Sequence, residues 1–332
     1  MARGVLPERV VIKIGASALL SGGRPDPVKL AAVADAVVRL RADGIQTVVV
    51  GSGAAAVGRT RLAEAGIPVD PTARQPAAAV GQGPLFEAFR DAFEARGLIA
   101  AQFPLTPLDL TGPEHGEGVR AALEEALDGG LVPVVNENDA VTGRGGDVLA
   151  ALVAGSLRAA RLLLLTDVPG LSEAGPRQDA VRRVPEIAVM TPEVRRLGGG
   201  PARGPGPGGV AGTLCAAWTA TLAGVPVVIA DAGTQDAVVR AVRGEDIGIL
   251  VHPREAGAAY DDAYDDSWRI IVRGGRTRLT SVNGRVDASS ALTGRSPLTP
   301  GRGQRPRAVG AVGAVGAVRA AVRPSYASPS AV

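Results

Sequence analysis

Positive charge in this chain comes almost entirely from arginine, so its two lysines stand out. Of the 36 lysine and arginine residues, only Lys13 and Lys29 are lysines. Lys13 lies at the end of an apolar run and is followed by Ile14 and Gly15. At the carboxyl end of a strand in a parallel sheet, a lysine can reach an anionic ligand and a glycine lets the backbone approach it. We therefore interpret Lys13 as a candidate phosphate-binding residue, although a lysine at a strand end can also simply face water.

Four further segments are built mainly from glycine or polar residues; the first three end apolar runs, and the fourth comes just before a predicted helix. They are Gly-Ser-Gly-Ala at 51–54, Asn-Glu-Asn-Asp at 136–139, Thr-Asp at 166–167 and Gly-Pro-Gly-Gly at 206–209. Backbone amides, hydroxyl groups and the N-terminus of a following helix can bind a carboxylate or a phosphate. Each segment could also be an ordinary turn, because glycine, asparagine and aspartate favour turns in any protein. Taken together with Lys13, these segments indicate a ligand site.

The elements that must position these loops alternate along the chain. Short apolar runs are separated by longer amphipathic segments, a pattern that predicts βα units feeding a mostly parallel sheet. We expect strands at 10–14, 45–50, 99–104, 132–136, 161–166 and 226–230, and helices at 28–42, from about 54, at 77–96, 119–127, 149–154 and 209–223. Because ligands bind at the carboxyl ends of the strands in such sheets, the candidate loops should meet at one edge.

The composition changes after about residue 252. Three short segments at 268–272, 277–281 and 285–287 predict a small β appendage. From Ser296 onward proline, glycine and arginine dominate, and 308–318 repeats Ala-Val-Gly. Such a tail has little to bury, so we expect it to be disordered.

Charge and composition argue against several classes of protein. The net charge is only +3, because 33 acidic residues are interspersed with the 36 basic ones. The charge therefore does not favour nucleic acid as a partner. The single cysteine, Cys215, cannot form an internal disulfide, which suits a reducing compartment. We find neither a signal peptide nor an apolar run of membrane-spanning length. A soluble cytoplasmic protein is expected.

The order of the motifs resembles the glutamate 5-kinases, a branch of the amino acid kinase family, over about residues 10–252. The matching segments lie at 11–15, 51–59, 78–82, 132–141 and 162–167. The resemblance implies an α/β fold, an αβα sandwich with a mainly parallel sheet. It also implies transfer of the γ-phosphoryl group of ATP to the side-chain carboxylate of glutamate, the first step of proline synthesis. ATP and Mg²⁺ would be the cofactors, and the chain would form a homo-oligomer.

The resemblance also divides the chain. Residues 8–255 would form the amino acid kinase domain, 256–295 a shortened remnant of a PUA-type β domain, and 296–332 a low-complexity tail.

Several single residues acquire roles through the resemblance. Lys13 and Asp147 would be catalytic, with Asp147 also contacting the metal ion. The substrate-binding residues would be Ser52, Gly53, Asn136 and Asp139, and Asp139 would suit the amino group of glutamate. The ATP-binding residues would be Lys13, Gly15, Thr166, Asp167, Gly208, Gly209 and Thr213.

Three positions depart from the family pattern. Gly145 replaces an aspartate that organises the lysines, Gly146 a substrate-binding asparagine, and Thr213 a lysine. Losing a lysine aimed at the developing phosphoryl charge typically raises the barrier by on the order of 3 kcal/mol or more, although Arg144 could supply the missing charge. Two alternatives therefore stay open. One is a catalytically inactive homologue that binds nucleotide or an amino acid, and the other is a kinase for another small carboxylate.

Overall fold

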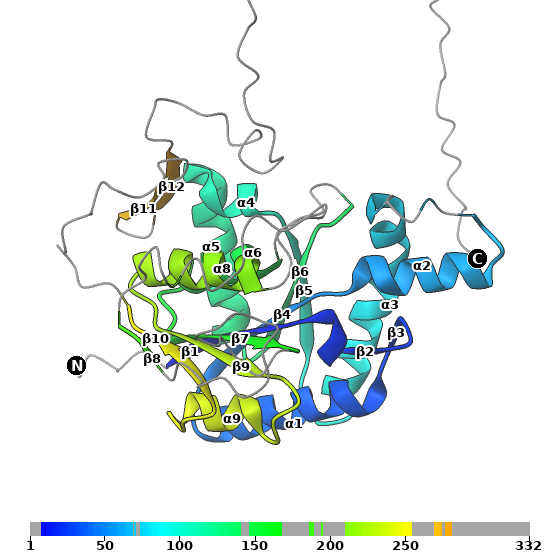
Figure 1. Cartoon of the computed structure of the whole chain (residues 1–332), viewed down its shortest axis with the longest axis horizontal. Coiled ribbons are helices and arrows are strands. Elements are labelled where there is room, and N and C mark those ends of the chain that lie inside the picture. Colours follow the sequence, from blue (N-terminus) through cyan, green and yellow to red (C-terminus); the bar gives the residue numbers. More distant parts are fainter. Residues whose placement is uncertain are drawn as a thin grey trace, which may run out of the picture. The chain divides into compact units, whose positions relative to one another are not determined.

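A sheet of eight strands forms the centre of the protein (Figure 1). The computed structural model describes residues 8–68, 70, 74–140, 146–167, 186–188, 194, 210–253, 269–273 and 276–280. The strands of the sheet, in spatial order, are β5 (Ala100–Leu105), β6 (Val132–Glu137), β4 (Gln46–Gly51), β1 (Arg9–Ile14), β7 (Arg161–Thr166), β9 (Val227–Asp231), β10 (Gly248–Val251) and β8 (Glu186–Ile187). All neighbouring strands are parallel except β9 and β10, which are antiparallel.

Helices cover both faces of this sheet. They are α1 (Pro27–Ala42), α2 (Ala54–Glu64), α3 (Arg74–Glu94), α4 (Pro107–Thr111), α5 (Pro113–Asp128), α6 (Gly146–Ser156), α8 (Val210–Leu222) and α9 (Ala237–Val242), with a short 3-10 helix η1 (Ala16–Ala18). Alternate residues of β1 enter different cores, because successive strand side chains point to opposite faces. Ile12 packs with α1, α3 and α9, whereas Val11 packs with α5, α6 and α8. The predicted αβα sandwich is confirmed.

The elements that the sequence missed are short. The hairpin of β2 (Leu20–Ser21) and β3 (Arg24–Pro25), helices α4 and α9, and strands β8 and β10 were not predicted. Helix α5 starts at Pro113 and not near residue 119, since three glycine or histidine residues in its first turns hide the apolar pattern. Proline is nevertheless well suited to the first turn of a helix.

The region beyond residue 253 is described only in part. Strands β11 (Arg269–Arg273) and β12 (Arg276–Thr280) form an antiparallel hairpin, which overlaps two of the three predicted segments. The segment at 285–287 and the tail at 296–332 lie outside the described residues, and the remnant domain stays a prediction. Among the helices that the structure describes, none is both long and apolar enough to cross a membrane.

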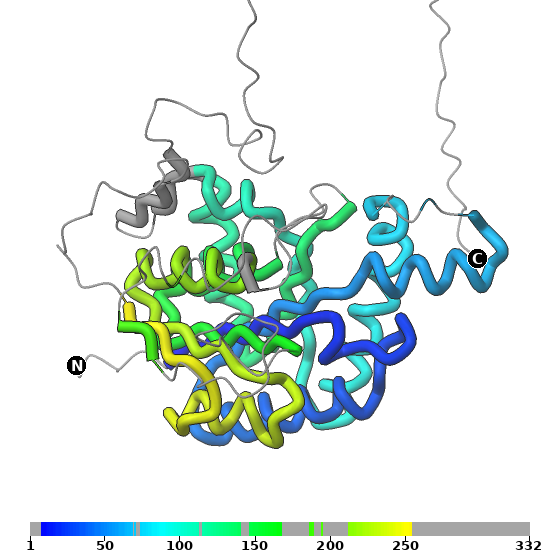
Figure 2. The backbone as a smooth tube through the Cα atoms, viewed as in Figure 1, coloured from blue at the N-terminus to red at the C-terminus, as the bar shows by residue number. Residues whose placement is uncertain are grey.

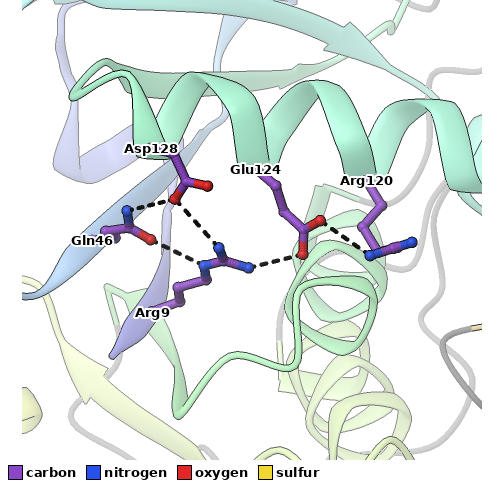
Figure 3. Close-up of polar contacts among 5 residues, drawn as sticks. All are labelled: Arg9, Gln46, Arg120, Glu124 and Asp128. Carbon is purple, nitrogen blue, oxygen red and sulfur yellow. Dashed lines mark hydrogen bonds and ion pairs between the residues drawn. The ribbon is translucent and has the colours of Figure 1, made fainter. Parts of the chain in front are cut away.

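A polar network lies at the amino end of strand β1 (Figure 3). Arg9, the first residue of β1, donates to Gln46 of β4 at 3.0 Å and to Glu124 of α5 at 2.9 Å. Its guanidinium also lies 3.6 Å from Asp128, and Gln46 donates to the same carboxylate at 3.1 Å. Arg120 donates to the second oxygen of Glu124 at 3.0 Å. The network ties two strands to α5, at the end of β1 away from Lys13.

Candidate active site

The candidate loops meet because the strands that carry them are neighbours in register. Ile14 at the end of β1 lies beside Gly51 of β4 on one side and beside Leu165 of β7 on the other. Gly51 in turn lies beside Asn136 of β6. The chain leaving each of these strands therefore starts at the same edge of the sheet, as the alternation of elements predicted.

Lys13 and Asp147 form an ion pair at this edge. Their side chains are only 12% and 14% exposed, so the attraction between them is screened less than that of a surface pair. Asp147 lies in the first turn of α6, where the helix dipole favours an acidic side chain. Thr213 of α8 donates a long hydrogen bond of 3.4 Å to the other carboxylate oxygen. Helices α6 and α8 lie side by side (Figure 1), which brings Thr213 to Asp147.

Gly15 brings the backbone close to the lysine ammonium. Its amide donates to the carbonyl of Leu165 at 3.3 Å. A Cβ atom on Gly15 would lie 3.5 Å from that carbonyl oxygen and 3.9 Å from Lys13 Nζ. The open side of Gly15 thus borders Lys13, and any longer side chain there would extend into the space beside the ammonium group.

On the other side of the edge, Gly146 lies close to two polar side chains. A Cβ atom built on Gly146 would lie 3.0 Å from Ser52 Oγ and 3.8 Å from Glu137 Oε2. Any side chain at Gly146 would therefore require Ser52 to move. Gly53 follows Ser52 with φ at +123°, a conformation that favours glycine.

Two buried polar atoms in this region have no hydrogen-bond partner in the described part of the chain. They are Nδ2 of Asn136 and Oδ1 of Asp139, whose residues are 7% and 8% exposed. Leaving such atoms unpaired costs free energy, which is expected where a ligand supplies the missing partner. A carboxylate oxygen can accept from an ammonium group, and an amide nitrogen can donate to a carboxylate.

Burial has a direct effect on Asp139. It raises the pKa of the Asp139 carboxyl, because removal from water disfavours the charged form. The positive charge of Arg74 and a hydrogen bond with Glu137 act in the opposite direction and lower that pKa.

Glu137 was not singled out from the sequence, although it belongs to the site. It ends β6 with its residue 6% exposed, and it contacts Asp139 and borders Gly146. A glutamate at the end of an apolar strand is seldom fully buried unless it is paired. Its position directly after Asn136 was therefore a usable signal.

The predicted nucleotide-side residues lie one strand further along. Thr166 ends β7 and is in register with Asp231 of β9, and its carbonyl accepts from the amide of Ala232 at 2.8 Å. Asp167 follows it and is exposed. Both residues lie at the same sheet edge as Lys13. Gly208 and Gly209 lie outside the described residues, as do Arg144 and Gly145.

A metal ion at this edge would depend on few protein ligands. No group of three or more histidine, cysteine, aspartate or glutamate side chains suited to a metal occurs among the described residues. Mg²⁺ in phosphoryl-transfer sites is typically held by one or two carboxylates together with the phosphates of the substrate. Asp147, a carboxylate beside Lys13, fits such a role.

Comparisons with known proteins agree with the fold and with the motifs. Residues 8–231 match the Amino acid kinase family. The glutamate 5-kinase of Trichlorobacter lovleyi is 37% identical over 266 residues, which cover 77% of this chain and 71% of that protein. The glutamate 5-kinase of Geobacter sulfurreducens is 36% identical over 322 residues, covering 88% of this chain and 86% of the relative.

Among solved structures, the carbamate kinase from Giardia lamblia bound to AMP-PNP is similar in fold. The TM-score is 0.53 at 18% sequence identity, and the match covers 74% of this chain and 99% of that one. At this identity the likeness concerns the fold alone. The family match and the identity to the two glutamate 5-kinases agree with it, and this chain is a member of the amino acid kinase family.

Proposed function

We propose that this chain is a glutamate 5-kinase-like enzyme, which uses ATP to phosphorylate the side-chain carboxylate of glutamate. Relatives named glutamate 5-kinase support the proposal along most of the chain. The observation that supports it most directly is the neighbourhood of two unlike groups at one sheet edge. One is the ion pair of Lys13 and Asp147, and the other is the pair of unpartnered buried atoms on Asn136 and Asp139.

The residues present suit ATP and magnesium. The nucleotide would be held by Lys13, Gly15, Thr166, Asp167 and Thr213, together with Gly208 and Gly209. Asp147 would contact Mg²⁺. Bound ATP supplies the phosphoryl group, and Mg²⁺ offsets part of its negative charge. The ammonium of Lys13 would offset more of that charge as it develops, while Asp147 holds the ammonium in place.

The acceptor would bind at the buried polar atoms. Asp139 would accept from the α-ammonium group, and Ser52 and Asn136 would donate to the α-carboxylate. Held in this way, an oxygen of the side-chain carboxylate attacks the γ-phosphorus, the bond from that phosphorus to the β,γ-bridging oxygen breaks, and ADP leaves. The product is an acyl phosphate. Positioning of the two substrates supplies much of the rate in such a reaction.

Two observations favour the alternatives. Thr213 contacts Asp147 with a hydroxyl group, which supplies no charge and favours weakened or absent catalysis in a homologue that still binds nucleotide or an amino acid. Gly146 brings no side chain to the substrate beside Ser52 and Glu137, whereas the family pattern has a substrate-binding asparagine there, and this difference favours a kinase for another small carboxylate.

One assay separates these functions. Purified protein is incubated with ATP, Mg²⁺ and glutamate, aspartate or a panel of other small carboxylic acids, and the acyl phosphate is trapped as a hydroxamate. Nucleotide binding is measured in parallel. Signal with glutamate above all other acids is expected. Signal only with another acid would change the substrate, and nucleotide binding without turnover of any acid would overturn the kinase proposal.

A further inference from the structure

The second lysine of the chain holds a backbone segment next to the site. Nζ of Lys29 donates to the carbonyl of Ser17 and to the carbonyl of Leu20, both at 2.7 Å. The amide of Asp26 donates to the carbonyl between them, that of Leu19, at 2.9 Å. Three carbonyl groups within four residues are therefore bound by the start of α1. Figure 2 traces this turn between β1 and α1 in dark blue.

This segment joins the two halves of the candidate site. It begins at Gly15, whose open side borders Lys13 Nζ, and includes η1. It ends at Leu20, which packs on the loop at 51–54, here called the acceptor-side loop. A Cβ atom on Gly53 of this loop would lie 2.9 Å from Leu20 Cδ1. The same Cβ would lie 3.4 Å from the Cβ of Ala16. A shift of the segment would therefore move the surroundings of both Lys13 and Ser52.

The charge of Lys29 does not stabilise the helix that carries it. It lies in the first turn of α1, where the helix dipole disfavours a positive charge. Asp26, the N-cap residue, accepts from the amides of Val28 and Lys29 at 2.9 and 3.3 Å, and Ser21 donates to it at 2.6 Å. These contacts fix the start of the helix, and with it the base of the lysine side chain.

We propose that Lys29 is a positioning residue for phosphoryl transfer. It holds residues 16–20, so that Gly15 beside Lys13 and the acceptor-side loop keep their places. The inference rests on the proposed function for its kinetic consequence. A lysine suits this task because one ammonium nitrogen carries three donors and can serve two converging carbonyls. The planar guanidinium group of arginine is larger and places its donors differently.

The expected consequences concern both motion and rate. In Lys29→Met the carbonyls of Ser17 and Leu20 lose their donor, so the amides of Ala18 and Leu19 should exchange hydrogen about tenfold faster or more. A displaced reacting group can cost up to about a hundredfold in rate. We therefore expect kcat/KM for ATP to fall at least about tenfold, with most of the loss in kcat, while the melting temperature changes little.

The test compares three variants of the full chain with the unchanged protein. Hydrogen exchange of the 15–21 peptide, affinity for a fluorescent ATP analogue, and kcat and KM for ATP are measured in each. Arg39→Met is the matched control, because it removes another cation from α1, one that pairs with Asp236, the N-cap residue of α9. It should leave exchange at 15–21 and kinetics unchanged. Lys29→Arg should fail to restore either one. If Lys29→Met does not fold, Lys29→Gln replaces it.

The inference and the proposed function can fail separately. Unchanged exchange at 15–21 in Lys29→Met, or equal kinetics in Lys29→Met and Arg39→Met, would overturn the positioning role while the kinase stands. Absence of turnover in the unchanged protein would overturn the kinase. If the unchanged protein shows no turnover, hydrogen exchange at 15–21 and affinity for the ATP analogue still test the role of Lys29. The positioning role is overturned if Lys29→Met and the unchanged protein have the same exchange rate and the same affinity.

Discussion

The charged residues at this site differ in whether their charge has a partner. Lys13 and Asp147 compensate each other in a place largely shielded from water. Asp139 is buried with one oxygen unpartnered, and its pKa is raised by that burial. Sites that bind ligands commonly keep such unfavourable groups because the ligand completes them.

Replacement of Lys13 tests the phosphate side. In Lys13→Met the charge that offsets the transferred group is removed, so kcat should fall by about a hundredfold or more. Hydroxamate formation under saturating ATP and glutamate measures the loss. Arg90→Met is the control, since the Arg90 side chain is 43% exposed and pairs with its neighbour Asp91, and it should keep full activity. Equal activity of the two variants would mean that the site is misplaced.

Asp139 should reveal itself in the pH dependence of stability. Its raised pKa means that its contribution to stability is present below the unfolded value of about 3.9 and is lost as pH rises through the folded value. The free energy of unfolding of Asp139→Asn, minus that of the unchanged protein, should therefore increase as pH rises above about 4. Urea unfolding at a series of pH values gives this difference.

Asp26 provides the opposite trend as a control. Hydrogen bonds from Ser21 and from the amide of Lys29 lower its pKa. The advantage of the unchanged protein over Asp26→Asn should be present above about pH 4 and shrink as pH falls further. The same slope for both variants would contradict the assigned environments.

At the scale of elements, α2 and α3 depend on two glycines where they cross. A Cβ atom on Gly58 would lie 1.7 Å from the carbonyl oxygen of Ala77, and one on Gly81 would lie 1.9 Å from that of Ala54. No real side chain fits at these distances. Helix α2 follows the acceptor-side loop directly and α3 begins with Arg74, whose charge acts on Asp139. The close crossing therefore also sets the surroundings of the acceptor side.

Gly58→Ala should force the two helices apart. We expect a loss of about 3 kcal/mol in the free energy of unfolding, at the upper end for overpacking because backbone atoms must move. Gly83→Ala in α3 is the matched control, since nothing lies within 4 Å of its Cβ position. That variant should gain about 0.5–1 kcal/mol, as alanine favours a helix over glycine. Urea unfolding measures both, and equal stabilities would contradict the close crossing.

At the scale of the whole molecule, a stabilising polar network and the candidate active site lie at opposite ends of the central strands. The network of Arg9 joins β1, β4 and α5 at the amino end of β1 (Figure 3), while Lys13 lies near the carboxyl end of the same strand. Within the described residues, Arg9 makes its polar contacts with Gln46, Glu124 and Asp128, and none of these three is hydrogen-bonded or ion-paired to Lys13. Changes at the two ends should therefore be separable.

Arg9→Met should lower stability without changing kinetics. Its side chain is 12% exposed and its loss leaves Glu124 and Gln46 without their shared donor, so we expect a cost of about 1–3 kcal/mol. Arg90→Met, at an exposed pair, should change stability by less than about 0.5 kcal/mol. Urea unfolding and steady-state kinetics are measured on the same preparations. A large fall in kcat for Arg9→Met in folded protein would show that the two ends are coupled.

The sequence alone determined the long strands and helices and the loops that follow them. Apolar runs such as 161–166 form strands because their residues must leave water, and glycine or polar residues mark where those strands end. The parallel βα pattern then requires the loops to meet at one edge. For these reasons the six long strands of the sheet, the longer helices on both of its faces and the neighbourhood of Lys13, Ser52 and Asn136 were predictable.

Only the tertiary structure decided the contacts between residues distant along the chain. The pairing of Lys13 with Asp147, the burial of Glu137 and the close approach of Gly146 to Ser52 depend on register and helix packing, which no local pattern encodes. Short elements such as β2, β8 and α9 are likewise fixed by their neighbours and not by propensity. Lys29 shows the difference most clearly. Its rarity was visible in the sequence, but its two carbonyl partners exist only because the chain turns back on α1.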